Sequence, residues 1–313
     1  MLDIKKNILL QQQSRQNLHV SPEQKALITK LSTPNGLYFT LWGLFYLSFW
    51  IGGLSSVIVL KGHVYYQLII SLFMGSILHS LTIVQHDCGH QSAYKSKQLN
   101  LWVGRFLAWF IYMPFSTFTQ LHRWHHTCLG QSPKDPDSWF YAKGHKYLFL
   151  RECLFMPRFI YLSLTRDDIK LEHKISVKKE LIFNTLSLLG LWIFLCFIGR
   201  YDIALFAFIL PMLSLSCIFN PISRGIEHYP LSCMHQDDER RLDLQHNTLS
   251  IHNRLLGLLW ANINYHVEHH IYPRVCFYRL PYLSKILQDK QYLKQQHLYQ
   301  NLAKYKKIYR QPQ

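Results

Sequence analysis

The chain has 313 residues, of which 49% are hydrophobic and 17% are charged, and its formal net charge is +16. This length allows one or two domains, but the long uncharged runs described below favour a single membrane-embedded domain over residues 1–313. The basic residues lie mostly outside these runs, in the two ends of the chain and in residues 120–180, a distribution that we attribute to membrane topology, and we expect no nucleic-acid partner.

The first 36 residues are predicted to be a polar N-terminal arm on the cytosolic side. Positions 11–13 are three consecutive glutamines, and Ser21-Pro22-Glu23 is typical of a helix start. We therefore expect an amphipathic helix just before the membrane. The N-terminus lacks a charged stub followed by a short apolar core and a small-residue cleavage site, so no removable signal peptide is expected.

Four runs without Asp, Glu, Lys or Arg are predicted to cross a membrane as helices. A helix needs about 20 apolar residues to cross a hydrocarbon core about 30 Å thick. The last run is short, so we expect it to continue to Pro221, and Pro211 is expected to bend it. The predicted spans are about residues 37–60, 64–85, 181–198 and 203–221. The expected fold class is an all-α integral membrane protein.

A fifth apolar run, residues 106–119, is predicted to be a re-entrant or interfacial helix. It is short, begins just after Arg105 and contains Pro114, features that disfavour a full crossing. A full crossing would also place His90 and His122 on opposite sides of the membrane, where they could not share a metal centre.

Lysine and arginine are distributed unevenly along the chain. There are five before residue 37, eleven in residues 120–180 and thirteen after residue 219, but only Lys61 and Arg200 in the two short turns. The positive-inside rule then places both termini in the cytoplasm, together with a helical cap formed by residues 86–180 and 222–313. The seven cysteines form no C-x-x-C pair, which fits a reducing compartment.

Eight of the 18 histidines form three tight clusters after the predicted spans. The clusters are His86-Asp-Cys-Gly-His90, His122-Arg-Trp-His125-His126 and His266-Val-Glu-His269-His270. Residues three or four apart lie on one face of a helix, so each cluster is a partial set of metal ligands. Imidazole suits iron, zinc, copper and nickel, and eight donors exceed the four ligands of a tetrahedral zinc. Two metal ions are the simplest interpretation.

The clusters resemble, in order and spacing, the three histidine boxes of the membrane fatty acid desaturase and hydroxylase superfamily. The stretch from Asn264 to Pro273, with Leu280-Pro281 shortly after it, is similar to the surroundings of the third box in fatty acid desaturases. The turn Lys134-Asp-Pro-Asp137 after the second box is similar too. The resemblance covers about residues 37–285 and implies a four-span helical protein with a cytosolic, non-haem diiron site.

The resemblance also implies a ligand set for two iron ions. The implied ligands are His86, His90, His122, His125, His126, His266, His269 and His270, with His228 as a ninth. Acyl-CoA desaturases have an Asn four residues before this ninth histidine, which joins their site through water, but this chain has Arg224 there. Polar residues close to the ligands are candidates for hydrogen bonds to the imidazoles: Asp87, Asp135, Asp137, Glu227, Asn264 and Glu268. For Asp135 and Asp137, capping the next segment is an equal alternative.

The activity that this resemblance implies is O2-dependent desaturation of a fatty acyl chain carried by a lipid or by a thioester such as acyl-CoA. An unactivated methylene is not acidic enough for a side-chain base, so a redox metal is needed. The sequence shows no G-x-G-x-x-G, no cysteine cluster and no His-Pro-Gly-Gly motif. A separate electron donor, a ferredoxin or a cytochrome b5-like protein, is therefore expected. The chain itself is expected in a bacterial inner membrane.

Three other activities compete with desaturation. A hydroxylase or ketolase of the same superfamily, acting on a lipid, sterol or carotenoid, has the same boxes, and the stretch from Arg224 to His228 keeps this alternative open. A membrane metal transporter or a b-type cytochrome would need its ligands at membrane depth, whereas these clusters follow the spans.

Aromatic residues such as Trp102, Trp109 and Tyr112 either line an acyl tunnel or anchor the chain at the interface. His252 is expected at the surface.

Overall fold

The computed structural model describes residues 20–142 and 144–288. In those residues every regular element is a helix, which confirms the all-α fold class. The described chain divides into two compact units. Within the described residues, the membrane unit comprises residues 35–120 and 153–220, and the polar unit comprises residues 20–34, 121–152 and 221–288. The start of the predicted arm, residues 1–19, and the end of the predicted cap, residues 289–313, lie outside the described residues.

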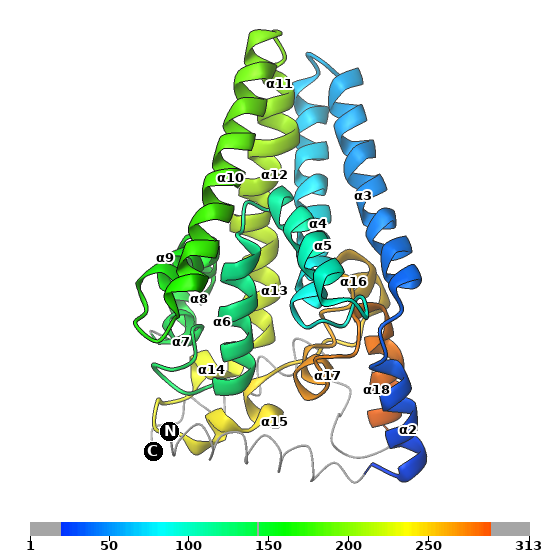
Figure 1. Ribbon diagram of the computed structural model, residues 1–313, viewed down its shortest axis with the longest axis vertical. Helices are drawn as coiled ribbons and strands as arrows, with labels where there is room; N and C mark the ends of the chain where they lie inside the picture. The colour runs from blue at the N-terminus through cyan, green and yellow to red at the C-terminus, as the bar shows by residue number, and fades with distance from the viewer. Residues whose placement is uncertain (1–19, 143, 289–313) are drawn as a thin grey trace. The chain divides into compact units, whose positions relative to one another are not determined.

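Four helices are long and apolar enough to cross a membrane, as predicted. They are α3 (Gly36–Val59), α4 (Val64–Gly89), α10 (Leu171–Phe197) and the helix Tyr201–Glu227. Figure 1 shows α3 beside α4, and α10 beside the last helix. Gly53 of α3 lies so close to α4 that an added Cβ atom would be 2.5 Å from Cγ of Met74. The small residue therefore permits the close approach of these two helices.

Two of these helices extend beyond the uncharged runs. Helix α4 continues to Gly89, so the first histidine box lies at its end, and α10 begins at Leu171, about one third of its length before the predicted span. The added part of α10 contains Glu172, Lys178 and Glu180. A helix can continue into water, where charges cost little, so the absence of charge delimits the hydrocarbon crossing and not the helix.

The last spanning helix changes its winding on both sides of Pro211. It consists of α11 (Tyr201–Ile203), the π-helical segment η2 (Ala204–Ile209), α12 (Leu210–Ser214), the π-helical segment η3 (Leu215–Phe219) and α13 (Asn220–Glu227). Proline lacks an N–H donor and its ring crowds the preceding turn, which accounts for the irregular winding of η2. The structure thus shows π-helical winding beside Pro211, and the bend expected there stays a prediction.

The predicted re-entrant segment 106–119 consists of the end of one helix and the start of the next. These are α5 (Lys97–Phe110) and α6 (Phe115–Cys128), each of 14 residues and too short to span. Glu180 of α10 holds the turn between them: its carboxylate accepts hydrogen bonds from Arg105 Nε, and from the backbone N–H and hydroxyl of Ser116, all at 2.8 Å. Helix α9 (Phe155–Thr165) completes the membrane unit.

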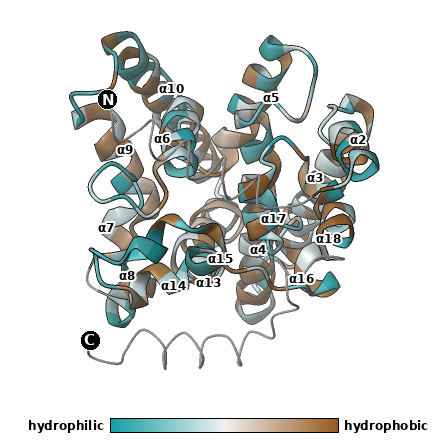
Figure 2. Ribbon diagram, turned by 90° about the horizontal axis from the view of Figure 1, so that it is seen from below, coloured by the Kyte–Doolittle hydropathy of each residue, from teal (hydrophilic) through white to brown (hydrophobic). Residues whose placement is uncertain are grey.

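The polar unit is built from short helices, and it contains the C-terminal part of α6. Helix α2 begins at the predicted place, where the Ser21 hydroxyl accepts a hydrogen bond from the N–H of Gln24. It packs on α18, since Gln24 Nε2 donates to the carbonyl of Ile286. Both helices carry hydrophobic and hydrophilic segments (Figure 2). The helices of this unit are α2 (Pro22–Leu31), α7 (Ser138–Tyr141), η1 (His145–Tyr147), α8 (Leu148–Glu152), α14 (Tyr229–Cys233), η4 (Glu239–Leu242), α15 (Leu244–Asn247), α16 (Arg254–Leu259), α17 (His266–Ile271), η5 (Phe277–Arg279) and α18 (Leu280–Gln288).

Candidate metal centre

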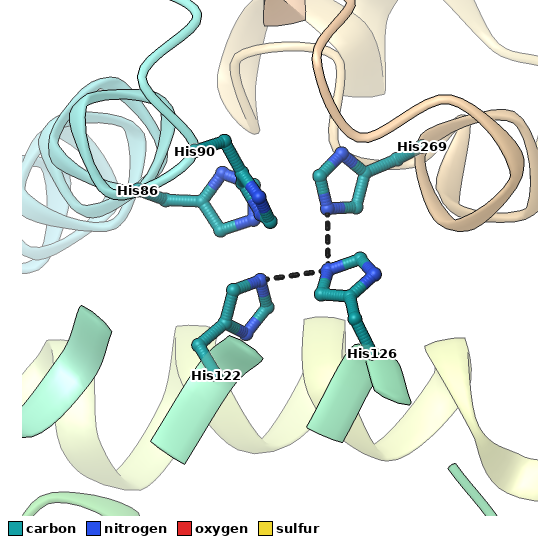
Figure 3. A group of neighbouring side chains, drawn as sticks. All are labelled: His86, His90, His122, His126 and His269. Carbon is teal, nitrogen blue, oxygen red and sulfur yellow. Dashed lines mark hydrogen bonds between the residues drawn. The ribbon is translucent and has the colours of Figure 1, made fainter. Parts of the chain in front are cut away.

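The second and third histidine boxes meet within the polar unit. On α6, His122 and His126 are four residues apart and their Nε2 atoms lie 2.9 Å from each other. Nε2 of His269, on α17, lies 3.1 Å from Nε2 of His126 (Figure 3). An imidazole nitrogen binds a metal ion such as zinc at about 2.0–2.1 Å, so two ligand nitrogens at a right angle lie about 3 Å apart. The three side chains thus have the spacing of ligands to one ion.

A second group of histidines forms around His228. Its Nε2 lies 3.1 Å from Nε2 of His125 and 3.0 Å from Nε2 of His266. His125, His228 and His270 also present nitrogens within 4.8 Å of one another, and all three are buried. The two groups together contain every predicted ligand of the polar unit, and the ligand predicted outside the boxes, His228, belongs to the second group.

Backbone contacts orient the His228 ring. Its Nδ1 lies 3.3 Å from the carbonyl oxygen of Asn247 and 3.3 Å from the hydroxyl of Thr248. A proton on Nδ1 that is donated to the carbonyl leaves the lone pair of Nε2 directed at the other imidazoles. This arrangement is common for histidines that bind metals.

The first box lies in the membrane unit, at the C-terminal end of α4. The rings of His86 and His90 are 4.6 Å apart, centroid to centroid; His86 lies in the last turn of the helix and His90 is its C-cap residue (Figure 3). Nδ1 of His86 lies 3.0 Å from Oδ1 of Asp87, which is also buried. Asp87 therefore contacts a predicted ligand imidazole on the side away from its Nε2.

Two carboxylates from the turn after the second box contact His125. Nδ1 of His125 lies 3.1 Å from Oδ1 of Asp135 and 3.2 Å from Oδ2 of Asp137. Asp135 also accepts hydrogen bonds from the N–H groups of Gly130 and Asp137, at 3.1 and 2.9 Å. The geometry is therefore compatible with both predicted roles of Asp135, which contacts an imidazole and caps its own turn.

The remaining candidates have mixed positions. Glu227 Oε2 lies 3.4 Å from Nε2 of His266. The Glu268 carboxylate instead accepts hydrogen bonds from the hydroxyl of Ser250, at 2.6 Å, and from His252, at 2.8 Å. Asn264 donates to two backbone carbonyls, those of residues 251 and 253. These hydrogen bonds of Asn264 and Glu268 brace the loop that leads into α17 and are not made to the proposed ligand imidazoles.

The expectation that His252 lies at the surface was wrong. Its side chain is only 10% exposed, because it contacts the fully buried carboxylate of Glu268. Burial raises the pKa of Glu268, but hydrogen bonds from His252, Ser250 and Ser284 outweigh it, so the pKa lies below its usual value. Spacing along the sequence carries no signal for this pair, whose members are brought together by the loop.

Arg224 connects the second histidine group to two buried acids. Its guanidinium forms an ion pair with Asp137, and its Nε lies 3.2 Å from Oε2 of Glu152. Because Asp137 also contacts His125, a continuous polar chain runs from His125 through Asp137 and Arg224 to Glu152. Sequence reasoning missed Glu152; the signal that could have indicated it is a lone acid in the apolar surroundings Leu148-Phe-Leu-Arg-Glu-Cys-Leu-Phe155.

Burial is the largest influence on the pKa values of His228, His270 and Glu152. It lowers the pKa of His228 and of His270 well below the ordinary value, which keeps both imidazoles neutral. It also raises the pKa of Glu152 to about 8, even though Arg224 acts in the opposite direction. Metal ions bind the neutral form of imidazole, so the buried rings of His228 and His270 are in the protonation state that ligation requires.

The donor set fits metal ions by residue type, number and spacing. Seven histidines of the polar unit form two groups of nitrogens at ligand spacing, which exceeds the four ligands of a tetrahedral zinc. Such imidazole donors suit iron, zinc and copper.

Comparison with known proteins identifies relatives of the chain. The family model described as fatty acid desaturase matches residues 62–302. A sphingolipid delta(4)-desaturase/C4-monooxygenase of Rattus norvegicus is 28% identical over 231 residues, which cover 68% of this chain and 63% of that protein. A sphingolipid delta(4)-desaturase of Homo sapiens is 26% identical, with coverage of 68% and 63%.

A shorter match involves an sn-1 acyl-lipid omega-3 desaturase (ferredoxin) of Synechocystis sp. It is 40% identical over 76 residues, which cover 24% of this chain and 21% of that protein. The chain therefore spans less than two thirds of the length of these curated relatives.

Proposed function

Because the chain belongs to the fatty acid desaturase family, we propose that it is a membrane-bound diiron desaturase. It uses O2 to introduce a double bond into an acyl chain that is carried by a lipid or by a thioester. The observation that carries this proposal is the meeting of two groups of imidazoles in the polar unit, one around half-buried His126 and one around buried His228. An oxidoreductase of lipids fits the family and the four apolar helices.

Two iron ions occupy the centre in this proposal. His122, His126 and His269 hold one ion, and His125, His228 and His270 hold the other, with His266 close to the second group. His86 and His90 complete the set, as the resemblance of the first box implies. Bound iron would supply the redox chemistry that breaks an unactivated C–H bond, which no side chain in the centre can do.

The protein side chains around the ligands fix their orientation and keep water out. His125 is 1% exposed and held by Asp135 and Asp137, while His228 is 1% exposed and held by the carbonyl of Asn247. An imidazole whose Nδ1 is held by a hydrogen bond keeps its orientation even when no metal ion is bound to its Nε2. The ligand nitrogens are therefore preorganised for metal ions, which lowers the cost of binding them.

The finer features of the reaction are also proposals. The relatives are named for acyl-lipid and sphingolipid substrates, and one of their names includes ferredoxin. By analogy this chain acts on an acyl lipid in the bilayer and receives electrons from a separate ferredoxin or cytochrome b5-like donor. The excess of lysine and arginine at both ends of the chain and in residues 120–180, compared with the two short turns, supports cytoplasmic termini and a cytoplasmic centre. We place the chain in a bacterial inner membrane.

Hydroxylation is the second candidate, because a specific observation favours it. The rat relative is named both a desaturase and a C4-monooxygenase, so one family member is assigned both outcomes. Removal of a second hydrogen gives an alkene, whereas transfer of oxygen to the same carbon gives an alcohol. The histidine geometry is compatible with either outcome.

Mass spectrometry of total lipids from a host that expresses the chain tests this function. We expect a new lipid two mass units lighter than its precursor, formed by the wild-type chain but not by a His269→Ala variant. The variant removes a nitrogen that lies 3.1 Å from His126, and its insertion in the membrane serves as the control for expression. A product sixteen units heavier would establish hydroxylation, and unchanged lipids with iron-loaded wild-type protein would refute both activities.

A further inference from the structure

A hollow of about 860 Å³ lies in the membrane unit between α5 and α10. One part of its wall is apolar and largely aromatic, and includes Trp102, Phe106 and Phe183, which are 64%, 54% and 66% exposed. The other part is polar, with Arg105 and Lys179. None of these residues belongs to the histidine boxes, and neither the proposed ligands nor the proposed reaction requires the hollow.

Hydrogen bonds fix the wall of the hollow. Arg105 Nε donates to Oε1 of Glu180 at 2.8 Å, and the indole N–H of Trp109 donates to the hydroxyl of Ser187 at 2.7 Å. Both pairs join α5 to α10. The hollow is therefore a preformed feature of the packed helices.

A polar hollow of about 480 Å³ continues the first one along α10. The two share Ser176, and the second is lined by Gln120, Asp168, Ile169, Lys170, Glu172 and His173. Together they offer an amphipathic surface, apolar at one end and polar at the other. A ligand that matches this surface has an apolar chain and a polar head.

The charges along this surface favour an anionic head. Glu180 is paired with Arg105, and Asp168 is paired with Arg166 at 2.8 Å. Of the other charged residues that line the two hollows, Lys170 and Lys179 are basic and Glu172 is acidic, which leaves an excess of one positive charge. Lys179 is exposed, and it lies where α10 changes from charged to apolar sequence. Basic residues at this depth of a spanning helix lie near lipid phosphates.

We propose that the hollow between α5 and α10 binds one anionic bilayer phospholipid. Its phosphate lies at Lys179, and one of its acyl chains lies along Phe106 and Phe183. The site is defined by side chains and not by diffuse surface charge, so its affinity depends on which lysine is changed. Lys178, the neighbour of Lys179, is also exposed but does not line the hollow.

This difference provides a matched pair of variants, Lys179→Glu and Lys178→Glu. The purified full-length protein is titrated with phosphatidylglycerol in phosphatidylcholine-containing micelles, and the bound lipid is counted by native mass spectrometry. We expect Lys179→Glu to weaken retention of phosphatidylglycerol about tenfold or more, and Lys178→Glu to retain it like the wild type. Equal losses in the two variants would show diffuse attraction only, and would overturn the proposal.

A second pair tests the position of the acyl chain. Phe183 and Phe194 both lie on α10 and are 66% and 57% exposed, but only Phe183 lines the hollow. Phe183→Ala should reduce retention of phosphatidylglycerol, whereas Phe194→Ala should not. Equal retention in both variants, or a wild-type protein that holds no phosphatidylglycerol, would contradict the site. None of the four residues is a proposed metal ligand, so these outcomes do not depend on desaturase activity.

Discussion

Replacing His125 with alanine is expected to remove about one of two bound irons and to reduce turnover below detection. Three interactions converge on this imidazole: Asp135 and Asp137 on Nδ1, and His228 beside Nε2. Alanine leaves the two carboxylates in place but removes the metal-binding imidazole that they orient. Iron is measured on the purified protein by elemental analysis, and product by lipid mass spectrometry.

The matched control for this variant is His235→Ala. The side chain of His235 is 88% exposed, and its Nδ1 lies 3.5 Å from Oδ2 of the exposed Asp237. We expect it to keep two irons and full turnover. The His125→Ala chain should still fold, because Arg224 still pairs with Asp137 and the N–H of Gly130 still binds Asp135. A His125→Ala protein with both irons and wild-type turnover would overturn the ligand assignment.

Replacing Arg224 with methionine is expected to destabilise the polar unit by about 3–5 kcal/mol, the usual cost of leaving a buried charge without its partner. Asp137 and Glu152 are both fully buried and both bind this guanidinium. Arg224→Lys should cost less, but it should not restore full stability, because an ammonium lacks the planar fork that serves two carboxylates at once. Thermal unfolding of the purified protein measures both effects.

Two further variants make this prediction specific. Arg166→Met removes an ion pair with Asp168, whose side chain is 55% exposed, so it should cost less than about 1 kcal/mol. Adding Asp137→Asn to Arg224→Met should recover part of the lost stability, because the buried carboxylate that has lost its guanidinium partner is then replaced by a neutral amide. If Arg224→Met unfolds at the wild-type temperature, or the double variant is less stable than the single one, the buried network does not support the fold.

The parts of the fold that are visible in the sequence are those set by local pattern. Uncharged length identified the four spanning helices, and spacing within each box indicated which imidazoles share a helical face, as for His122 and His126. The ends of α10 and α4 could not be predicted from the same signal, because a helix does not need apolar residues once it leaves the hydrocarbon.

The contacts that orient the ligands depend instead on the tertiary fold. Arg224 binds Asp137 and Glu152 across 87 and 72 positions of the chain, and His252 reaches Glu268 across a loop. No periodicity records such pairs. Arg224 stood out only as a departure from the family pattern, and its role follows from the acids that the fold places beside it.

The iron content of the purified wild-type chain tests the diiron proposal most directly. Elemental analysis is combined with an absorption spectrum, and a His86→Ala variant is measured beside the wild type, because the proposal assigns the first box of the membrane unit to the same centre. We expect two irons per chain without haem absorption, and fewer than two in the variant. Zinc or haem in the wild type, or an unchanged iron count in His86→Ala, would contradict the proposed centre.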